Sequence, residues 1–355
     1  MDIQEIIELV KKTKKFILNR EMVSDVKEKG IADYVTQVDI TVQNFLKEEL
    51  FILAPDIQFL GEETGLQNMK ADSFWILDPV DGTTNLMHDY QHSVVSLALC
   101  QQDEIVMGIV YDPFREDVFY AIKGKGSFLN GQPIHVSNVG KLSDTMIGIG
   151  TAKRELADEN FARFHRVFGQ CQDIRRIGSA ALELAYTACG RQGGYFEIYL
   201  NPWDYAAGML LIQEAGGKVT DFMGRDLNPR KGGSVVGTNG YIHTELGSLF
   251  YQEYKNKTYI NWITYGFSKK KLFLSKVTVS VVIGICFAAV LFIAFGLLVA
   301  ILNGAGRLTG GISLFLKLAI GFGIEASVVV FVTTCLGAIV INLSRNIIVV
   351  LLYRT

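Results

Sequence analysis

The chain has 355 residues with 34 Lys and Arg against 36 Asp and Glu, and its formal charge of −2 excludes an overall basic field for holding nucleic acid. The charge is unevenly divided: residues 261–355 carry eight basic side chains and one acidic side chain, Glu325, whereas residues 1–260 carry 26 basic and 35 acidic ones. An acidic part of ordinary composition followed by a very apolar tail excludes a disordered chain and a single uniform soluble domain.

The first 250 residues carry the pattern of a layered α/β domain. Apolar residues recur at helical spacing over 3–17 and again over 42–53, so we expect two helices to open the domain. Short apolar runs then predict strands, and the last third alternates helix and strand. The predicted strands are 57–60, 74–77, 94–100, 105–111, 118–122, 194–198 and 218–222, and the later helices are 179–190 and 203–215. This alternation predicts an α/β fold.

The tail has the pattern of a membrane hairpin. Residues 277–302 contain no charged side chain, and 26 residues exceed the roughly 20 that cross a hydrocarbon core as a helix. A second apolar stretch covers 312–343 and is interrupted only by Lys317 and Glu325. We therefore predict two transmembrane helices at about 277–302 and 312–343, joined by a short polar turn. A buried helical hairpin in a large soluble core is the less consistent alternative.

Basic residues predict the orientation of this hairpin. Four lysines (269, 270, 271 and 276) precede the first span, whereas only Arg307 lies in the loop, so the positive-inside rule places both termini in the cytoplasm. Residues 251–276 are expected to form a linker and an interfacial basic segment, with Tyr259, Trp262 and Tyr265 at the membrane surface. The chain begins with a charged amphipathic segment, and its five cysteines form no paired motif, which indicates a reducing compartment. We thus expect a multi-pass protein of the cell membrane with a cytoplasmic catalytic domain.

Carboxylates beside glycine dominate the chemistry of the globular part. Asp78 and Asp81 lie three residues apart around Pro79, and two such charges in one space repel each other unless a cation lies between them. Oxygen ligands without a neighbouring His or Cys favour Mg²⁺, which keeps some waters and recruits phosphate groups. The following Gly82 and Thr83 open a predicted helix whose free amides suit a phosphate.

Three ordered motifs give these acids a family resemblance. The segments Gly-Glu-Glu-Thr at 61–64, Asp-Pro-Val-Asp-Gly-Thr-Thr-Asn at 78–85 and Trp-Asp-Tyr-Ala-Ala-Gly at 203–208 resemble the signatures of the inositol monophosphatase family. The resemblance covers about residues 1–250 and does not extend to the tail. It implies a layered α-β-α-β-α sandwich, a Mg²⁺-dependent and Li⁺-sensitive phosphatase activity, and a possible homodimer.

The resemblance also implies roles for individual residues. The expected ligands of two Mg²⁺ ions are Glu62, Asp78, the carbonyl of Val80, Asp81 and Asp204. Asp78 would bridge the two ions, and a third, weaker ion is a further family feature. The nucleophile would be a metal-activated water positioned by Glu62 and Thr83, with the Thr83 hydroxyl oriented by Asp39. The amides of Gly82 and Thr83 are expected to hold the phosphate.

Substrate choice stays open in the sequence. Glu197, seven residues before Asp204, matches the family's carboxylate for inositol hydroxyls, and Ser179 lies in the stretch that lines the family's substrate cleft. Arg176 in the same stretch also suits a second phosphate. We therefore expect a phosphomonoesterase for inositol monophosphate or a related sugar phosphate. A phosphatase for nucleoside 3′-phosphates, fructose 1,6-bisphosphate or NADP is the alternative within this fold.

Two alternatives belong to other classes of protein. The globular part could be a non-catalytic phosphate-binding head on a membrane protein, although a head without turnover has no need of the complete acid set. The tail could instead be a small membrane protein joined by gene fusion, with a role of its own around Glu325. The expected partners are a small phosphate monoester and a membrane, and no nucleic acid polymer.

Overall fold

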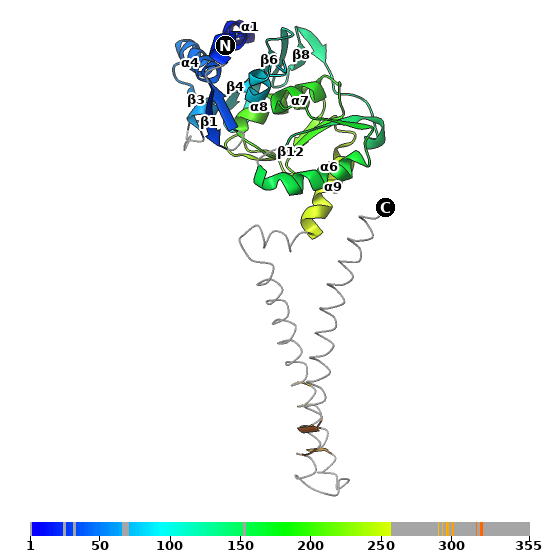
Figure 1. Cartoon of the computed structure of the whole chain (residues 1–355). Coiled ribbons are helices and arrows are strands. Elements are labelled where there is room, and N and C mark those ends of the chain that lie inside the picture. The colour runs from blue at the N-terminus through cyan, green and yellow to red at the C-terminus, as the bar shows by residue number, and fades with distance from the viewer. Residues whose placement is uncertain are drawn as a thin grey trace. The chain divides into compact units, whose positions relative to one another are not determined.

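The computed structural model describes residues 2–256 apart from 24–25, 31–32, 66–70 and 152–153, together with positions 290, 293, 296, 297, 300, 301, 317, 320 and 321. The chain divides into two compact units, Met1–Lys255 and Asn256–Thr355. The described helices and strands with assigned bounds lie in the first unit, apart from Asn256, the last residue of the final helix (Figure 1).

A sheet of seven strands forms the first half of this unit, in the order β3-β4-β5-β6-β7-β8-β9. Its strands are β3 (Gln58–Gly61), β4 (Ser73–Asp81), β5 (Val94–Gln101), β6 (Glu104–Asp112), β7 (Asp117–Ile122), β8 (Gly126–Leu129) and β9 (Gln132–Ile134). The β3–β4 pair is parallel and the other neighbours are antiparallel. Side chains alternate across the sheet: Phe74 and Ile76 enter one hydrophobic core, whereas Trp75 and Leu77 enter another.

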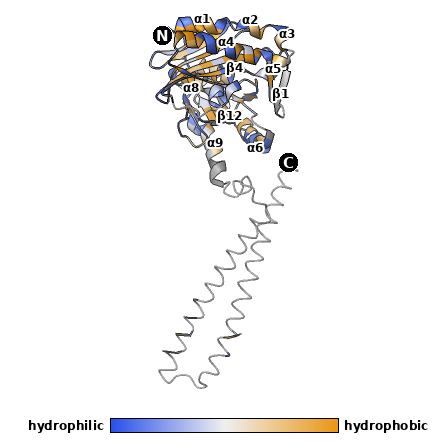
Figure 2. Ribbon diagram, turned by 90° about the vertical axis from the view of Figure 1, so that its left-hand side faces the viewer, coloured by the Kyte–Doolittle hydropathy of each residue, from blue (hydrophilic) through white to orange (hydrophobic). Residues whose placement is uncertain are grey.

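Amphipathic helices cover the Trp75 face. They are α1 (Ile3–Lys11), α2 (Lys14–Ile17), α3 (Arg20–Val23) and α4 (Gln37–Leu53). Hydrophobic residues of α1, such as Ile6, and of α4, such as Leu46, share one core with this face of the sheet. The ribbon of α1 and α4 carries both hydrophilic and hydrophobic colours, as expected for helices with one face on a core and one in solvent (Figure 2). A two-stranded ribbon, β1 (Val26–Gly30) and β2 (Asp33–Thr36), precedes α4.

Two helices separate the first sheet from a second one. They are α7 (Ala180–Ala188) and α8 (Pro202–Glu214). The second sheet has the order β11-β10-β12-β14-β13, with β10 (Met146–Ile149), β11 (Asp173–Arg175), β12 (Gly194–Leu200), β13 (Lys218–Thr220) and β14 (Gly233–Thr238). One core joins Phe74 of β4, Leu211 of α8 and Val235 of β14. Ten of the thirteen residues of α8 are buried, which accounts for a helix that is apolar on all sides.

The outer face of the second sheet is covered by α6 (Ala157–Phe168) and α9 (His243–Asn256). Val167 of α6, Phe250 of α9 and Phe196 of β12 form a separate core there. The order of layers is therefore helices, sheet, helices, sheet, helices. The short elements α5 (Thr83–Met87), η1 (Glu62–Thr64), η2 (Leu142–Asp144) and η3 (Arg154–Leu156) lie in the connections. This confirms the predicted α-β-α-β-α sandwich.

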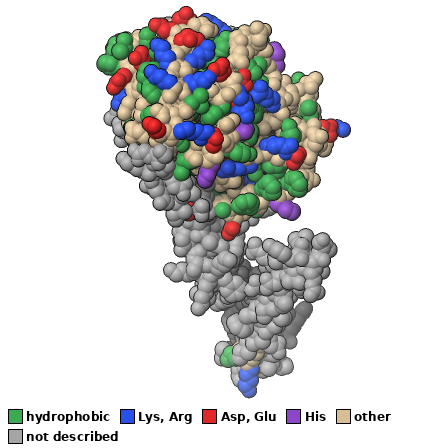
Figure 3. All heavy atoms as spheres, turned by 45° about the horizontal axis from the view of Figure 1, so that its top comes forward, with side chains coloured by type: hydrophobic (Ala, Val, Ile, Leu, Met, Phe, Trp, Pro, Cys, Tyr) green, Lys and Arg blue, Asp and Glu red, His purple; other side chains and the backbone are tan. Residues whose placement is uncertain are grey.

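The predicted strands and helices that carry the three motifs agree with the structure. The bounds of elements elsewhere in the chain differ from the prediction. Helix α9 continues to Asn256, whereas the linker was expected to begin at residue 251. The predicted spans 277–302 and 312–343 lie outside the described residues apart from nine single positions, all helical. Among the residues that the structure describes, no helix has the length and apolar character needed to cross a membrane. Acidic and basic side chains are interspersed on the face drawn in Figure 3.

Candidate active site

Parallel pairing of β3 with β4 brings two of the predicted acids together. Gly61 at the end of β3 pairs with Leu77, so Glu62 follows directly beside Asp78. A Cβ on Gly61 would lie 2.2 Å from Oε1 of Gln43 on α4, and this same oxygen accepts a hydrogen bond from the amide of Glu63 at 3.1 Å. The glycine therefore lets α4 approach closely and hold the acidic turn in place.

An irregularity in β4 turns its two aspartates toward one space. Asp78 pairs with Ser96 and Asp81 with Val94, and the register shifts between them around Pro79, which has no amide hydrogen for a ladder bond. The amide of Val80 donates to Oδ1 of Asp78 at 3.0 Å. The Asp78 carboxylate thus stabilises the irregular part of β4 that turns it toward the site.

Helices α7 and α8 close the other side of this space. The Ser179 hydroxyl and the Ala181 amide donate to Oδ2 of Asp81 at 2.8 and 2.6 Å, which fixes the start of α7 against β4. Asp204 lies in the first turn of α8, where its Oδ2 accepts a hydrogen bond from the amide of Asn201 at 2.7 Å. The Ser96 hydroxyl donates to the Trp203 carbonyl at 3.0 Å and ties α8 to the first sheet. Four acids, one after β3, two in β4 and one in α8, therefore converge.

The electrostatics of this cluster are those of acids crowded in a buried space. Burial, followed by the charges of Glu62, Asp81 and Asp204, raises the pKa of Asp78 well above its ordinary value. Burial raises the pKa of Asp81 to about 6, and burial together with the charges of Asp81 and Glu62 raises that of Asp204. As the side chains stand in the described part of the chain, no group of three or more His, Cys, Asp or Glu residues has the geometry to hold a metal ion. Hard oxygen donors that repel one another nevertheless fit Mg²⁺ in their chemistry, because a divalent cation offsets that repulsion.

A hydrogen-bonded pair, Asp39 and Thr83, lies beside the acids. Asp39 is 1% exposed, and its Oδ2 accepts hydrogen bonds from the amide and hydroxyl of Thr36 in the capping box that begins α4. Its Oδ1 lies 2.9 Å from the Thr83 hydroxyl, which is also 3.1 Å from the Val80 carbonyl. A hydroxyl has one hydrogen to donate, so when Asp39 accepts it the Thr83 oxygen can accept a hydrogen bond from water.

Gly82 shapes the turn between Asp81 and α5. Its φ of +101° is left-handed, and a Cβ there would lie 2.9 Å from the His92 carbonyl. The Asn85 amide nitrogen donates to the carbonyls of His92 and Ile177 at 2.8 and 3.0 Å, which fastens this turn to the loop before Ser179. The backbone that follows Asp81 is therefore held rigidly next to the carboxylates.

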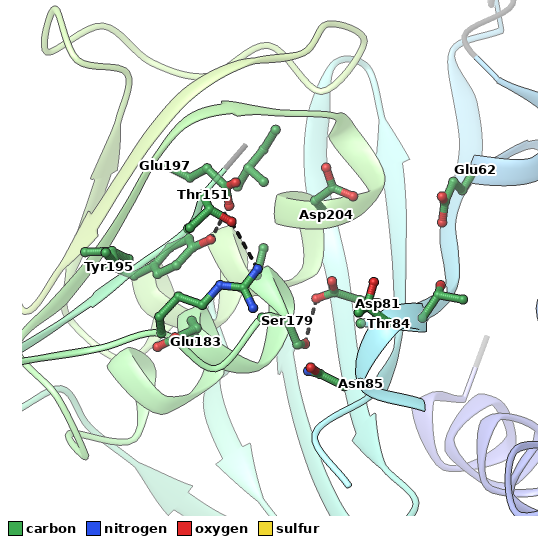
Figure 4. Close-up of a pocket in the computed structure, with 18 residues that line it drawn as sticks. Glu62, Asp81, Thr84, Asn85, Thr151, Ser179, Glu183, Tyr195, Glu197 and Asp204 are labelled. Carbon is green, nitrogen blue, oxygen red and sulfur yellow. Dashed lines mark hydrogen bonds between the residues drawn. The ribbon is translucent and has the colours of Figure 1, made fainter. Parts of the chain in front are cut away.

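These parts border one cavity of about 320 Å³ (Figure 4). Seven of the predicted site residues line it: Glu62, Asp81, Gly82, Thr83, Ser179, Glu197 and Asp204. The predicted Glu197 lines its far wall, where Tyr195 donates a hydrogen bond to Oε2 of Glu197. The structure brings Asp39, Asp78 and Val80 next to the cavity through hydrogen bonds to its lining residues or their neighbours.

Several residues of the far wall were missed in the sequence. Glu183 is 1% exposed, accepts hydrogen bonds from the Ile177 amide at 2.8 Å and the Gln192 side chain at 3.0 Å, and has a pKa raised by burial to about 7. Thr151 was also missed: its hydroxyl accepts a hydrogen bond at 3.0 Å from Arg176, which the sequence had already indicated as suited to a second phosphate. Glu183 lies in an apolar helix, where an acid at a core position is the one signal that could have drawn attention to it.

Comparisons with known proteins agree with this fold and site. Residues 2–255 match the model of the inositol monophosphatase family. The chain is 40% identical over 234 residues to an inositol-1-monophosphatase of Rhizobium meliloti, covering 64% of this chain and 87% of that protein. It is 37% identical over 225 residues to the Nus factor SuhB of Escherichia coli K12, covering 62% of this chain and 84% of that protein.

A solved structure supports the match to this family. The extragenic suppressor protein SuhB of Bartonella henselae superposes with a TM-score of 0.65 at 33% identity, over 70% of this chain and 97% of that one. The chain therefore belongs to the inositol monophosphatase family, whose members are phosphoric monoester hydrolases and are in general Mg²⁺-dependent. The relative matches almost end to end, whereas about 100 residues of this chain, the unit Asn256–Thr355, lie beyond the family match.

Proposed function

We propose that this protein is a Mg²⁺-dependent phosphatase of inositol monophosphate or a related sugar phosphate. The observation that supports this most directly is that Asp81 and Asp204 line one cavity with Asp78 beside them. Burial raises the pKa of all three, and the charges of neighbouring acids raise those of Asp78 and Asp204 further. A cavity of about 320 Å³ is at the small end of ligand pockets and suits a substrate of the size of a sugar phosphate.

The proposed ligands of Mg²⁺ are the residues of the acid cluster and one carbonyl: Glu62, Asp78, Val80, Asp81 and Asp204. When bound, Mg²⁺ supplies positive charge to the phosphate oxygens and lowers the pKa of a nearby water. The chain's own contribution is to hold these oxygens in place beforehand, through the amides of Val80, Ala181 and Asn201. Occupancy by a third ion stays a prediction from the family resemblance.

In the proposed reaction, the protein orients both the water and the phosphate. The Thr83 hydroxyl donates to Asp39 and accepts from the attacking water, while Glu62 accepts that water's other hydrogen bond. The Gly82 and Thr83 amides donate to the phosphate, and the left-handed conformation of Gly82 sets their direction. Water adds to phosphorus as the P–O bond to the alcohol breaks, which releases inorganic phosphate and the free alcohol.

The substrate's alcohol part would lie against the far wall. Glu197 offers a carboxylate to adjacent hydroxyl groups, and Ser179 lies between that wall and Asp81. Arg176 is the feature that favours the alternative substrates with a second anionic group, such as fructose 1,6-bisphosphate, NADP or a nucleoside 3′-phosphate. A homodimer stays a prediction from the family resemblance.

A phosphate-release assay on the full chain in detergent tests this function. Inositol 1-phosphate, fructose 1,6-bisphosphate, NADP and a nucleoside 3′-phosphate are each supplied with and without Mg²⁺. We expect Mg²⁺-dependent release, fastest with inositol 1-phosphate, and none from the matched Asp78→Asn variant. Phosphate release from none of the substrates would favour the non-catalytic binding head, and a preference for another substrate would assign one of the alternative activities.

We further propose that the tail anchors the enzyme to a membrane with its catalytic unit in the cytoplasm. The uncharged run of 26 residues at 277–302 supports this. Four apolar positions at helical spacing, described as helix and between 61% and 69% exposed, also fit a lipid-facing surface: Val290, Ile293, Leu297 and Ile301. The four lysines at 269, 270, 271 and 276 support the orientation.

Cell fractionation and labelling test the anchor. We expect the full chain to sediment with membranes and a cysteine placed at Gly306 to react with an impermeant reagent from outside intact cells, while Cys171 stays unlabelled. Labelling of Cys171 with protection of the Gly306 position would reverse the orientation. A full chain that stays in the soluble fraction without detergent would contradict the anchor itself.

A further inference from the structure

Tyr195 and Glu197 form a pair on one face of β12. Residues two apart on a strand point to the same side, and the Tyr195 hydroxyl donates a hydrogen bond to Oε2 of Glu197. Tyr195 is 1% exposed and Glu197 is 8% exposed, yet both line the catalytic cavity. Phe196 between them enters the core on the opposite face. The Tyr195 side chain is therefore buried, and the small part of it that remains exposed faces the cavity.

The neighbouring strand leaves space for this pair. Gly148 and Tyr195 are direct partners in the β10–β12 ladder, and Gly150 follows β10. A Cβ on Gly150 would lie 1.8 Å from Oε2 of Glu197 and 2.6 Å from the Tyr195 oxygen. No side chain fits there while the pair stands as it does, so the backbone at Gly150 forms a close wall behind the hydrogen bond.

The protonation of Tyr195 also depends on charges in the wall of the cavity. The negative charge of Glu183, in the same wall, contributes to the raised pKa of Tyr195, whereas burial and the charge of Glu197 raise the pKa of Glu183 itself. Burial and the Glu197 charge raise the pKa of Tyr195 well above its ordinary value, so this phenol keeps its proton and acts as a donor. A phenol that keeps its proton holds one oxygen of the Glu197 carboxylate at the Tyr195 hydroxyl, which limits how the carboxylate can rotate.

We propose that Tyr195 is a positioning residue that determines specificity for polyol phosphates by orienting Glu197 toward the substrate's hydroxyl groups. This rests on the proposed function, in which Glu197 receives those hydroxyls. The hydrogen bond to Oε2 turns the other carboxylate oxygen toward the cavity, where it accepts from a hydroxyl of the substrate. Tyr195 itself touches neither the phosphate nor the acid cluster, so its effect is confined to substrates with hydroxyl groups near the ester.

The variant Tyr195→Phe tests this with two substrates. Inositol 1-phosphate carries hydroxyl groups beside the ester, whereas p-nitrophenyl phosphate carries none. We expect the KM for inositol 1-phosphate to rise about tenfold with little change in kcat, since loss of one hydrogen bond to a charged group costs about 1.5 kcal/mol. Both parameters for p-nitrophenyl phosphate should stay at the wild-type values. Tyr120→Phe is the control, because it removes the hydroxyl of another tyrosine with a buried side chain, on β7.

A double-mutant cycle keeps the test decisive. Once Glu197→Gln has removed the charge, adding Tyr195→Phe should raise the KM for inositol 1-phosphate by less than twofold. Equal losses with both substrates, an unchanged KM for inositol 1-phosphate, or multiplicative effects in the cycle would each overturn the proposal. If Tyr195→Phe does not fold, Glu197→Asp replaces it, since the shorter acid withdraws from the hydroxyl, and the same selective rise in KM is expected. A wild-type protein that hydrolyses neither substrate would instead refute the proposed function.

Discussion

Replacing Asp81 by Asn separates the charge of the acid cluster from its hydrogen bonds. Oδ2 of Asp81 accepts the hydrogen bonds of Ser179 and Ala181, and the oxygen of an Asn side chain can accept both in the same place. The substitution therefore keeps the contact between β4 and α7 and removes one negative charge. We expect the metal-free variant to be more stable than the wild type at neutral pH and to be inactive.

The magnitude follows from the pKa of Asp81. A folded value of about 6 against 3.8 in the unfolded chain means that the folded protein binds this proton more tightly. The corresponding stability is present below pH 4 and is lost as the pH rises through 6, which amounts to about 3 kcal/mol at pH 7.5. An asparagine side chain does not titrate, so the Asp81→Asn variant should gain up to that amount at pH 7.5 and about 0.5 kcal/mol at pH 4. For a unit of this size, the gain at pH 7.5 corresponds to about 5–10 °C in Tm.

Thermal unfolding followed by circular dichroism measures this in EDTA at pH 7.5 and pH 4, using residues 1–255, the length over which relatives are complete proteins. Addition of Mg²⁺ should then raise the Tm of the wild type and have a much smaller effect on Asp81→Asn. The exposed Asp226 provides a control, since Asp226→Asn should change neither value. No gain in Tm at pH 7.5, or an equal gain at both pH values, would refute the charge argument, and an unchanged Mg²⁺ response would refute the metal assignment.

Three further outcomes are expected. Asp78→Asn should lower kcat by several orders of magnitude while circular dichroism stays unchanged, and near-normal turnover would contradict its role between two ions. Gly61→Ala should cost about 1–3 kcal/mol of stability, because its Cβ meets Gln43 at 2.2 Å and the Phe59 ring at 2.8 Å. Combining it with Gln43→Ala should restore part of that stability without restoring the Glu62 turn or full activity. Millimolar Li⁺ should inhibit phosphate release at optimal Mg²⁺, and full activity there would count against close functional likeness to the family.

The sequence predicted the parts of the site that depend on local pattern. The apolar run of β4 ends in Asp78 and Asp81, so both the strand and its acids were visible in a few residues. The predicted helix 203–215, which has Asp204 near its start, was equally local and corresponds to α8. The layer order followed from the family resemblance, because the sequence itself does not state which strands pair.

The missed parts depend on contacts between distant segments. Strand β10 has only four residues, and the alternating pair Ile147 and Ile149 is too short a pattern to identify a strand in a sequence. Tyr195 looks like an ordinary core aromatic until β12 is placed beside β10 and its hydroxyl is found on Glu197. Glu183 likewise depends on Ile177 and Gln192, which approach it only in the folded protein.

In each aspartate of the site, one carboxylate oxygen accepts a backbone hydrogen bond that stabilises the fold. Replacing such an aspartate by Asn, which keeps that bond and removes the charge, is therefore the informative substitution. One oxygen of Asp78 accepts the Val80 amide, one oxygen of Asp204 accepts the Asn201 amide, and one oxygen of Asp39 caps α4 at Thr36. Each of these bonds survives replacement of the acid by Asn, because the amide oxygen can take the position of the bonded one. Alanine at the same positions would remove a cap or a turn, which typically costs about 1 kcal/mol, and would confuse loss of folding with loss of chemistry. The carboxylates are thus oriented by the backbone in the absence of a cation, and it is their charge that the cation is needed to offset.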